Sequence, residues 1–365
     1  MSRFPLSPSA CWLALVLCAP VCGAEYSITE IPQMTSASGI NRHGVVVGDN
    51  AFYVHRSRVV NQLPTIAANG INDLGQIAAA GRGAFGEPQA EVIYVTGGSQ
   101  LLGNVLTVAA AISNSGFVVG NGGDAHARAH ALLWQLRNPT VTTGFGIMGP
   151  VPDHEPFYDP QSEANAVNET GVAVGWAETG VLDAQGEFLG IVIHAFRWEN
   201  GTITDLGTLP GGENSSASGI NDRGEIVGSS GTATGATHAF LIRRHAMIDL
   251  GNLAHDPQLN SSASAINAGG EIVGSSDTRL ADNSVAGRAF IYRDGRMRSL
   301  TTLIERRSPL NGSVTLTDAP AISCNGWIAA NGFDNTTLVK HAYLLIPRDR
   351  ADGDRDRDDK DCRRR

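Results

Sequence analysis

One short sequence pattern recurs seven times and constrains the fold more than any other feature of the chain. Each copy contains a small residue, an apolar anchor, Asn or Ser, two variable positions, Gly and a short apolar run. The anchors have a mean spacing of 47 residues and are Ile40, Ile71, Ile112, Val167, Ile220, Ile266 and Ile322. Blades of β-propellers repeat at about 40 to 50 residues, whereas the rungs of a β-solenoid are about half as long. The spacing therefore predicts a propeller.

A single repeat predicts four short strands. In the copy from Ser215 to Leu253 they span 216–220, 225–228, 238–242 and 246–250. Asn221 and Gly224 have the spacing of a type I turn with a bulge, in which Gly takes a positive φ. The turn recurs at Asn41 and Gly44, Asn72 and Gly75, Ser113 and Gly116, Asn168 and Gly171, Asn267 and Gly270, and Ser323 and Gly326. We expect a structural role for these residues.

The last repeat lacks a fourth strand, because the sequence turns polar after the strand predicted at His341 to Ile346. The segment from Tyr26 to Ile31 resembles the fourth strand of another repeat, Ile203 to Leu206. We expect it to complete the last blade and leave no open sheet edge. The prediction is an all-β, seven-bladed propeller with four-stranded blades at 36–66, 67–106, 107–146, 163–211, 215–254, 260–304, and 315–347 together with 25–32.

Small residues mark the strand predicted to lie innermost in each blade. An alanine stands three residues before every anchor, and Gly or Ala stands directly before it. Seven strands that converge on one axis leave no room for larger side chains. The pattern fits a closed ring.

The two ends of the chain have their own signatures. Residues 1–24 resemble a secretory signal, with Arg3, an apolar stretch from Cys11 to Pro20, and small residues up to Ala24. They predict a secreted or periplasmic protein, and no segment has the roughly 20 apolar residues of a membrane span. Residues 348–365 alternate Asp with Arg or Lys, which is typical of a disordered charged tail. We expect Cys324 and Cys362 to be free thiols, although one bridge between them is possible.

Composition excludes several classes of function. A net charge of −9 argues against nucleic acid as a partner, because that binding needs clustered Lys and Arg. The chain has no nucleophile elbow, zinc-protease motif or phosphate loop. We therefore expect no cofactor and no metal site, and we expect a monomer.

Three repeated segments together resemble a known family. They are His-Ala-Phe at His194 and His238, Asp-Leu-Gly-Thr-Leu from Asp205, and Ser-Ala-Ser-Gly-Ile-Asn with Gly-Glu-Ile-Val-Gly from Ser216. This combination resembles the HAF family of bacterial extracellular repeat proteins, and the likeness spans nearly all of the chain after residue 24. Other copies drift, with Asn50-Ala51-Phe52 and Glu91-Val92-Ile93 at the motif position. The resemblance implies an exported bacterial protein, and it implies no ligand or enzymatic activity.

The recurrent histidines are His130, His194, His238 and His341. Equivalent positions of neighbouring blades lie too far apart to share one metal ion, whose bonds are about 2 Å long. We expect these imidazoles to hydrogen-bond the backbone within or between blades.

Loop lengths point to one face of the ring. The connections from strand two to strand three and between blades share a face, and the long ones span 121–129, 145–162, 176–193 and 275–287. Binding residues are concentrated on loops held by a rigid scaffold. The candidate ligand-binding residues are Asp153, His154, Glu155, Phe157, Tyr158, Asp159 and Trp176.

Three functions remain open at this stage. The first is a non-enzymatic module that binds an extracellular glycan, peptide or protein through the long-loop face. The second is a polysaccharide hydrolase or lyase, whose dispersed acids would come from Asp153, Glu155, Asp159 and Asp183. The third is a purely structural surface module. We assign no catalytic residue.

Overall fold

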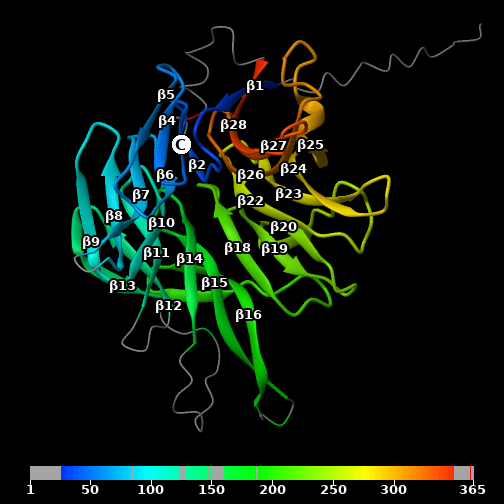
Figure 1. Cartoon of the computed structure of the whole chain (residues 1–365). Coiled ribbons are helices and arrows are strands. Elements are labelled where there is room, and N and C mark those ends of the chain that lie inside the picture. Colours follow the sequence, from blue (N-terminus) through cyan, green and yellow to red (C-terminus); the bar gives the residue numbers. More distant parts are fainter. Residues whose placement is uncertain are drawn as a thin grey trace, which may run out of the picture.

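The computed structural model describes residues 26–83, 86–123, 129–145, 148, 160–183, 185, 188–348 and 362. Seven four-stranded antiparallel sheets are arranged around a central axis (Figure 1). The predicted all-β, seven-bladed propeller is confirmed. No helix within the described ranges is long and apolar enough to cross a membrane.

The chain forms the blades in sequence order, each from its innermost strand outward. Blades 1 to 4 are β2 to β5 (Gly39–Ile40, Val45–Gly48, Ala51–Val54, Val59–Gln62), β6 to β9 (Ala67–Ile71, Gln76–Arg82, Pro88–Tyr94, Ser99–Val105), β10 to β13 (Thr107–Ile112, Phe117–Gly123, Ala129–Gln135, Asn138–Gly144) and β14 to β17 (Ser162–Val167, Ala173–Leu182, Phe188–Glu199, Thr202–Asp205). Blades 5 to 7 are β18 to β21 (Ser215–Ile220, Ile226–Gly231, Thr237–Arg243, Ala246–Asp249), β22 to β25 (Ser261–Ile266, Ile272–Arg279, Val285–Arg293, Arg296–Ser299) and β26 to β28 (Val314–Ile322, Ile328–Asp334, Lys340–Pro347). A 3-10 helix, η1 (Leu300–Leu303), follows blade 6.

The N-terminal strand β1 (Tyr26–Ile31) closes the ring. It pairs antiparallel with β28, so that Tyr26 lies opposite Pro347 and Ile31 opposite Ala342. In Figure 1 the dark blue β1 lies beside the red β28. Tyr26 and Ile31 are buried, with exposed fractions of 1% and 0%. The predicted closure by the opposite end of the chain is confirmed.

Close packing explains the small residues on the innermost strands. A Cβ atom on Gly70 would lie 3.0 Å from the carbonyl oxygen of Ala110 in the next blade. Similarly, a Cβ on Gly219 would lie 3.2 Å from the Cα of Ala265. Contacts this short between neighbouring backbones leave space for Gly or Ala alone.

A second set of glycines permits close contact inside most blades, although blade 2 has Ala79 at this position, and the set was not predicted from the sequence. The innermost strand has a register shift, for example between Ala217 and Gly219, which moves its backbone toward the second strand. A Cβ on Gly228 would lie 2.0 Å from the carbonyl oxygen of Ser216. The same clash, at 1.8 to 2.1 Å, would arise at Gly48, Gly120, Gly175 and Gly274.

The hairpin turns connect neighbouring blades as well as neighbouring strands. In all seven turns the Gly has a φ between 73° and 83°. The Asn221 side chain accepts hydrogen bonds from the N–H groups of Arg223 and Glu225, and its Nδ2 donates to the carbonyl of Asn267 in the next blade. Equivalent interblade bonds run from Asn41 to Asn72, Asn72 to Ser113, Asn168 to Asn221, and Asn267 to Ser323. Where Ser replaces Asn, its shorter side chain has no amide to reach the next blade.

We expect Asn221→Ala to reduce the free energy of unfolding by about 2 to 3 kcal/mol, because several buried hydrogen bonds are lost together. Asn221→Ser is the matched control, since Ser323 still accepts the N–H of Trp327 four residues later. It should lose about half as much. Urea denaturation of the three proteins measures the difference, and equal losses for Ala and Ser would refute the role of the side-chain amide.

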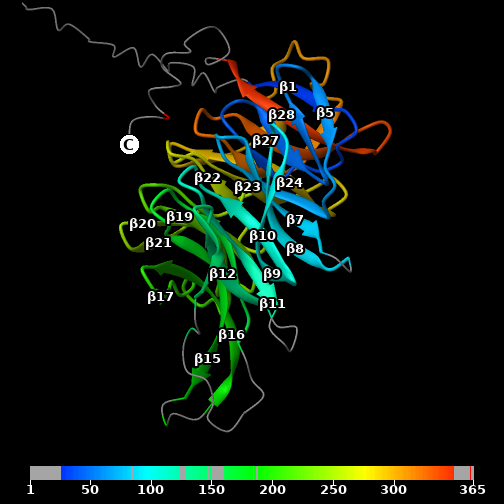
Figure 2. The same ribbon diagram turned by 90° about the vertical axis from the view of Figure 1, so that its left-hand side faces the viewer.

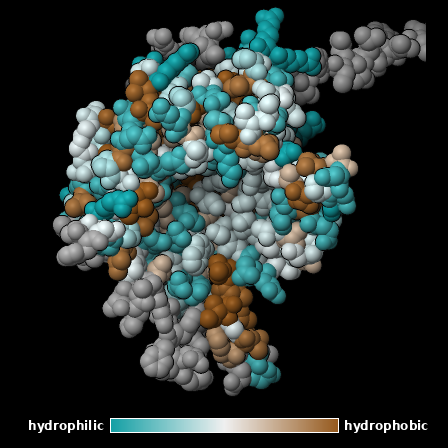
Figure 3. Space-filling model, in the orientation of Figure 1, coloured by the Kyte–Doolittle hydropathy of each residue, from teal (hydrophilic) through white to brown (hydrophobic). Residues whose placement is uncertain are grey.

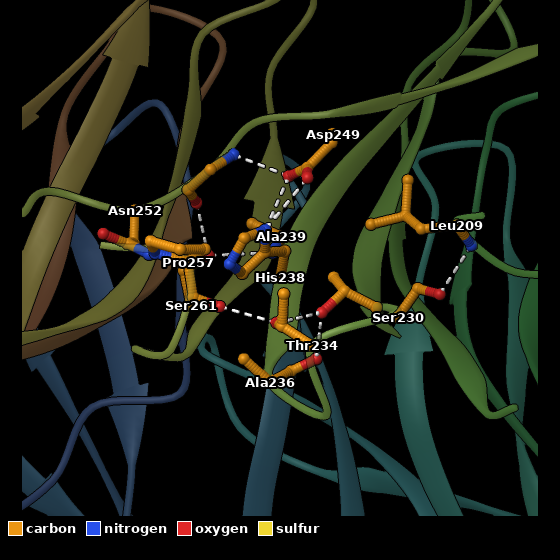
Figure 4. Close-up of polar contacts among 12 residues, drawn as sticks. Leu209, Ser230, Thr234, Ala236, His238, Ala239, Asp249, Asn252, Pro257 and Ser261 are labelled. Atoms are coloured by element: carbon orange, nitrogen blue, oxygen red, sulfur yellow. Dashed lines mark hydrogen bonds and ion pairs between the residues drawn. The ribbon is translucent and has the colours of Figure 1, made fainter. Parts of the chain in front are cut away.

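Three of the four repeated histidines, His194, His238 and His341, pair with carboxylates, which corrects the backbone contacts expected for them. His238 Nδ1 lies 2.9 Å from an oxygen of Asp249 on the adjacent strand of the same blade (Figure 4). His194 pairs in the same way with Asp205 at 2.8 Å, and His341 with Glu30 of the closing strand at 3.2 Å. The His of one repeated motif and the Asp of the next therefore form one interstrand pair. A sequence alone does not show this pairing because the two motifs lie 11 residues apart.

Strand register corrects two assignments of the drifting motif. Phe196 and Phe240 lie opposite the bulge glycines Gly175 and Gly228. In blade 2 the residue opposite the equivalent Ala79 is Glu91, so Gln89-Ala90-Glu91 holds the motif position and Glu91-Val92-Ile93 does not. In blade 1, Ala51 lies opposite Gly48, so Asp49-Asn50-Ala51 holds the motif position and Asn50-Ala51-Phe52 does not. In blade 2, a carboxyl group therefore occupies a position that is phenylalanine in blades 4, 5 and 6.

Burial of Glu91 raises the pKa of its carboxyl, although a hydrogen bond with Ser99 opposes the shift. A raised folded-state pKa means that ionisation opposes folding at neutral pH, and that this cost disappears as pH falls below the ordinary value of 4.5. We expect Glu91→Gln to stabilise the protein by about 1 kcal/mol at pH 7. The gain should shrink toward zero at pH 4 in urea titrations. A gain that is independent of pH would contradict this explanation.

Cys324 and Cys362 form a disulfide, so the expectation of two free thiols is wrong. Cys324 belongs to the hairpin turn of blade 7, at one end of the central channel. A separation of 38 residues is long enough for the chain to return to this turn, and sequence alone does not reveal whether it does. The predicted signal at 1–24 lies outside the described residues, as does most of the predicted tail.

Candidate functional site

Most of the residues that the sequence nominated for binding lie outside the described residues, namely Asp153, His154, Glu155, Phe157, Tyr158 and Asp159. Trp176 is described and lies half-buried on β15, where its indole N–H donates to the Glu163 carboxylate at 3.3 Å. Asp183 follows the end of β15 and accepts the N–H of Gln185 at 2.9 Å. The structure therefore brings together none of the nominated residues that it describes.

A pocket of about 580 Å³ lies on the long-loop face, between the connection into blade 5 and the end of β19. Ile193 of blade 4 forms one wall, and the other walls come from blade 5. Six hydroxyl side chains line it, which are Ser215, Ser216, Ser229, Ser230, Thr232 and Thr237. None of these residues was nominated from the sequence.

The segment Leu209-Pro210-Gly211-Gly212 shapes the pocket. The buried Leu209 donates its backbone N–H to the Ser230 hydroxyl at 2.9 Å (Figure 4). Gly211 has a φ of 77°, which favours glycine. A Cβ on Gly212 would lie 2.0 Å from the Gly231 carbonyl oxygen, so glycine permits the close approach of the two segments. The feature of the sequence that marks this pocket is the pair Gly211-Gly212, which stands beside polar residues without a predicted role.

Asn214 links blade 4 to blade 5 at the edge of the pocket. Its Oδ1 accepts the backbone N–H of Ile193 at 2.9 Å, and its carbonyl accepts the N–H of Gly231 at 2.8 Å. Asn214 therefore fixes the end of a blade 4 strand against the wall of the pocket.

The lining can make hydrogen bonds and attract positive charge. Ser216 and Ser229 lie opposite each other on β18 and β19, and their hydroxyls have no hydrogen-bond partner within the described part of the chain. Glu213 is exposed at the pocket and forms no ion pair there. The lining includes no Lys, Arg or His. Hydroxyls, backbone groups and one carboxylate of this kind can form hydrogen bonds with a bound ligand.

Beside the pocket, β15 and β16 continue beyond the ring as a long pair of strands, which we call the arm (residues 177–183 and 188–193). Figure 1 and Figure 2 show the arm projecting from blade 4. This region was predicted to be a long loop, but the two strands pair as far as Leu182 and Phe188. The loop assigned to 275–287 is likewise mostly strand, because β23 reaches Arg279 and β24 begins at Val285. Both loop assignments were wrong because β-branched residues there favour continued pairing.

One face of the arm is apolar and exposed. Alternate residues of β16 point to this face, and the exposed fractions of Leu189, Ile191 and Ile193 are 67%, 45% and 37%. Leu182 of β15 is 44% exposed. Figure 3 shows the apolar patch in brown on the projecting arm. Because Ile193 also lines the pocket, the patch and the pocket form one continuous surface.

On the opposite face of the ring, turn residues form hydrogen bonds that link neighbouring blades. At the second turn position, the backbone N–H donates to the side chain at the same position in the next blade, which links Arg42 to Asp73, Asp73 to Asn114, Asn114 to Glu169, and Glu169 to Asp222. The acceptors are three carboxylates and the amide oxygen of Asn114, and they hold neighbouring turns together at 2.8 to 3.0 Å. No cluster of metal-ligating residues is found in the described ranges.

Comparison with known proteins shows similarity in fold and no match in sequence. No family model matches the chain, and no curated protein matches it. The β-propeller domain of the trilobed protease of Pyrococcus furiosus is similar with a TM-score of 0.57 at 8% identity, over 88% of this chain and 97% of that one. That domain is described as having an open velcro topology, whereas β1 closes the ring here.

Two peptidases contain a similar propeller. An acylaminoacyl peptidase bound to a chloromethyl ketone has a TM-score of 0.54 at 9% identity, covering 88% of this chain and 51% of that one. The Pyrococcus horikoshii acylaminoacyl peptidase has a TM-score of 0.52 at 10% identity, covering 88% and 53%. This chain spans about half the length of these peptidases. At such low identity the similarity concerns the fold, and function must be argued from the site.

Proposed function

We propose that this protein is an exported binding module that captures a protein partner in the pocket between blades 4 and 5. One observation carries the proposal: a rigid ring holds a polar pocket directly beside an exposed apolar arm. Pockets that combine apolar walls with a few oriented polar groups are the usual form of binding site. The secretory features of residues 1–24 and the Cys324–Cys362 disulfide support export to an oxidising compartment. The repeated His–Asp pairs are compatible with membership of the HAF family.

A peptide suits this surface better than a glycan does. Sugar rings usually stack on exposed aromatic side chains, and the described lining contains none. Trp176 does not supply one, since its indole is half-buried and bound to Glu163. Free hydroxyls at Ser216 and Ser229 can instead pair with peptide groups.

Blocking the pocket tests the proposal. Phage selection of 12-residue peptides on the wild-type protein is expected to enrich binders, and Ser229→Phe should weaken them at least tenfold by filling the pocket. Ser275→Phe is the matched control, because Ser275 pairs with Ser262 in blade 6 as Ser229 pairs with Ser216 in blade 5. Equal loss in both variants, or no enrichment, would overturn the proposal. Glycan-array binding lost in Ser229→Phe alone would replace the peptide with a glycan.

A further inference from the structure

The outer edge of the arm is an unpaired strand edge. β15 pairs with one edge of β16 along the arm, and β17 pairs with the other edge only from Phe196 to Glu199. On that second edge, no strand lies beside Leu189 to Ile193 among the described residues. The backbone groups of alternate residues point to the same edge of a strand. Ala195 donates its N–H outward to Ser215, and Ile193 donates outward to Asn214. By this alternation, the N–H and C=O of Ile191 also point outward, and they have no partner in the described chain.

Within the described part of the chain, this edge has none of the usual protection before Ile193, whose N–H is bound by Asn214. Natural proteins protect a sheet edge with Lys, Pro, inward-pointing charges or a covering segment, because bare edges recruit other strands. The edge from Leu189 to Ile193 reads Leu-Gly-Ile-Val-Ile and contains no charge and no proline. Its apolar side chains are exposed as well. An added strand could satisfy the free backbone groups and cover the apolar face together.

Charge distinguishes among the possible occupants. Acidic residues surround the arm and pocket: Glu178 lies opposite Ile193 on β15, Asp183 follows the strand end, and Glu213 lines the pocket. No basic residue lines the pocket, and none lies on the described part of the arm. A second copy of this chain would bring the same acids together and be repelled. A strand carrying Lys or Arg beside apolar residues would be attracted.

From this arrangement we infer that the edge of β16 binds an extended peptide of alternating apolar and basic residues by strand addition. This inference rests on the proposed function and names the partner class and its mode of binding. The apolar side chains of the peptide cover Leu189 and Ile191. Its backbone pairs with Ile191, and its end reaches the pocket beside Asn214. The basic side chains alternate with the apolar ones and lie on the other face, and the acidic surroundings of the arm and pocket attract them electrostatically.

A capped eight-residue peptide of alternating valine and lysine, with a fluorescein label, is the probe. Anisotropy titration with the full chain is expected to show saturable binding that weakens as salt rises. The same peptide with valine and glutamate should bind at least tenfold more weakly. A valine–lysine peptide N-methylated at alternate residues cannot pair along its edge and should not bind measurably. Equal affinity for the N-methylated peptide would overturn strand addition.

Variants locate the binding edge. Ile191→Lys places a charge on the edge and should weaken binding of the valine–lysine peptide at least tenfold. Val285→Lys is the control, because Val285 is 50% exposed on the corresponding hairpin of blade 6. If Ser229→Phe abolishes binding while Ile191→Lys does not, the pocket proposal stands and strand addition fails. If neither variant weakens binding, both fail. A dimer in sedimentation analysis that Ile191→Lys dissociates would assign the edge to a second copy and overturn the peptide.

Discussion

Deletion of Tyr26 to Ile31 is expected to remove most of the stability of the whole ring. β1 fills the outer position of blade 7, and Tyr26, Ile28 and Ile31 are buried, with exposed fractions of 1%, 9% and 0%. Each such side chain contributes about 1.5 to 3 kcal/mol. Their sum is comparable to the roughly 5 to 15 kcal/mol of a typical domain. Urea denaturation followed by circular dichroism should show a midpoint near zero or no cooperative transition.

The control restores the strand at the other end of the chain. Because Tyr26 lies opposite Pro347, a short turn can join them. A permutant with 26–31 placed after Pro347 through such a turn should recover most of the wild-type midpoint. A stable deletion variant would show that closure by β1 is not what stabilises the ring.

Gly228→Ala is expected to cost about 3 to 5 kcal/mol, although it adds one methyl group. The new Cβ would lie 2.0 Å from the Ser216 carbonyl oxygen and 2.8 Å from the Ala217 Cα, both backbone atoms of the adjacent strand. Relief requires the two strands to separate, which breaks their pairing and the packing behind it. Urea denaturation measures the loss.

Gly235→Ala provides the comparison for Gly228→Ala. Gly235 has a φ of 82° in a loop, and a Cβ there would meet nothing within 4 Å. Its substitution should cost about 1 kcal/mol, from backbone conformation alone. Similar losses at the two positions would mean that the strands have more freedom than the structure shows.

The sequence was sufficient to predict the ring because the pattern repeats. Seven copies of one turn show the blade, and the incomplete last copy points to β1. Other features depend on what folding brings together. His238 and Asp249 belong to separate motifs, and Cys324 meets Cys362 after the chain turns back. Glu91 occupies an aromatic position because of strand register, which a drifting motif does not reveal.

The candidate site was less predictable than the fold. The long segments around blade 4 indicated the face on which the pocket lies, but strand pairing converts one of them into the arm. The pocket is formed by Ser, Thr and Gly residues, which are common in any turn-rich sequence. Their role follows from the Asn214 bridge and from the close approach at Gly212, and both are tertiary contacts.

Hydrogen exchange of the full chain, measured by mass spectrometry with and without the saturating valine–lysine peptide, most directly tests where the partner binds. We predict slower exchange at residues 189–193 and 211–216, where the arm meets the pocket. The turns on the opposite face, such as 72–75 and 221–224, should exchange at unchanged rates. Protection of those turns, or unchanged exchange on the arm at saturation, would contradict the assignment of the binding face.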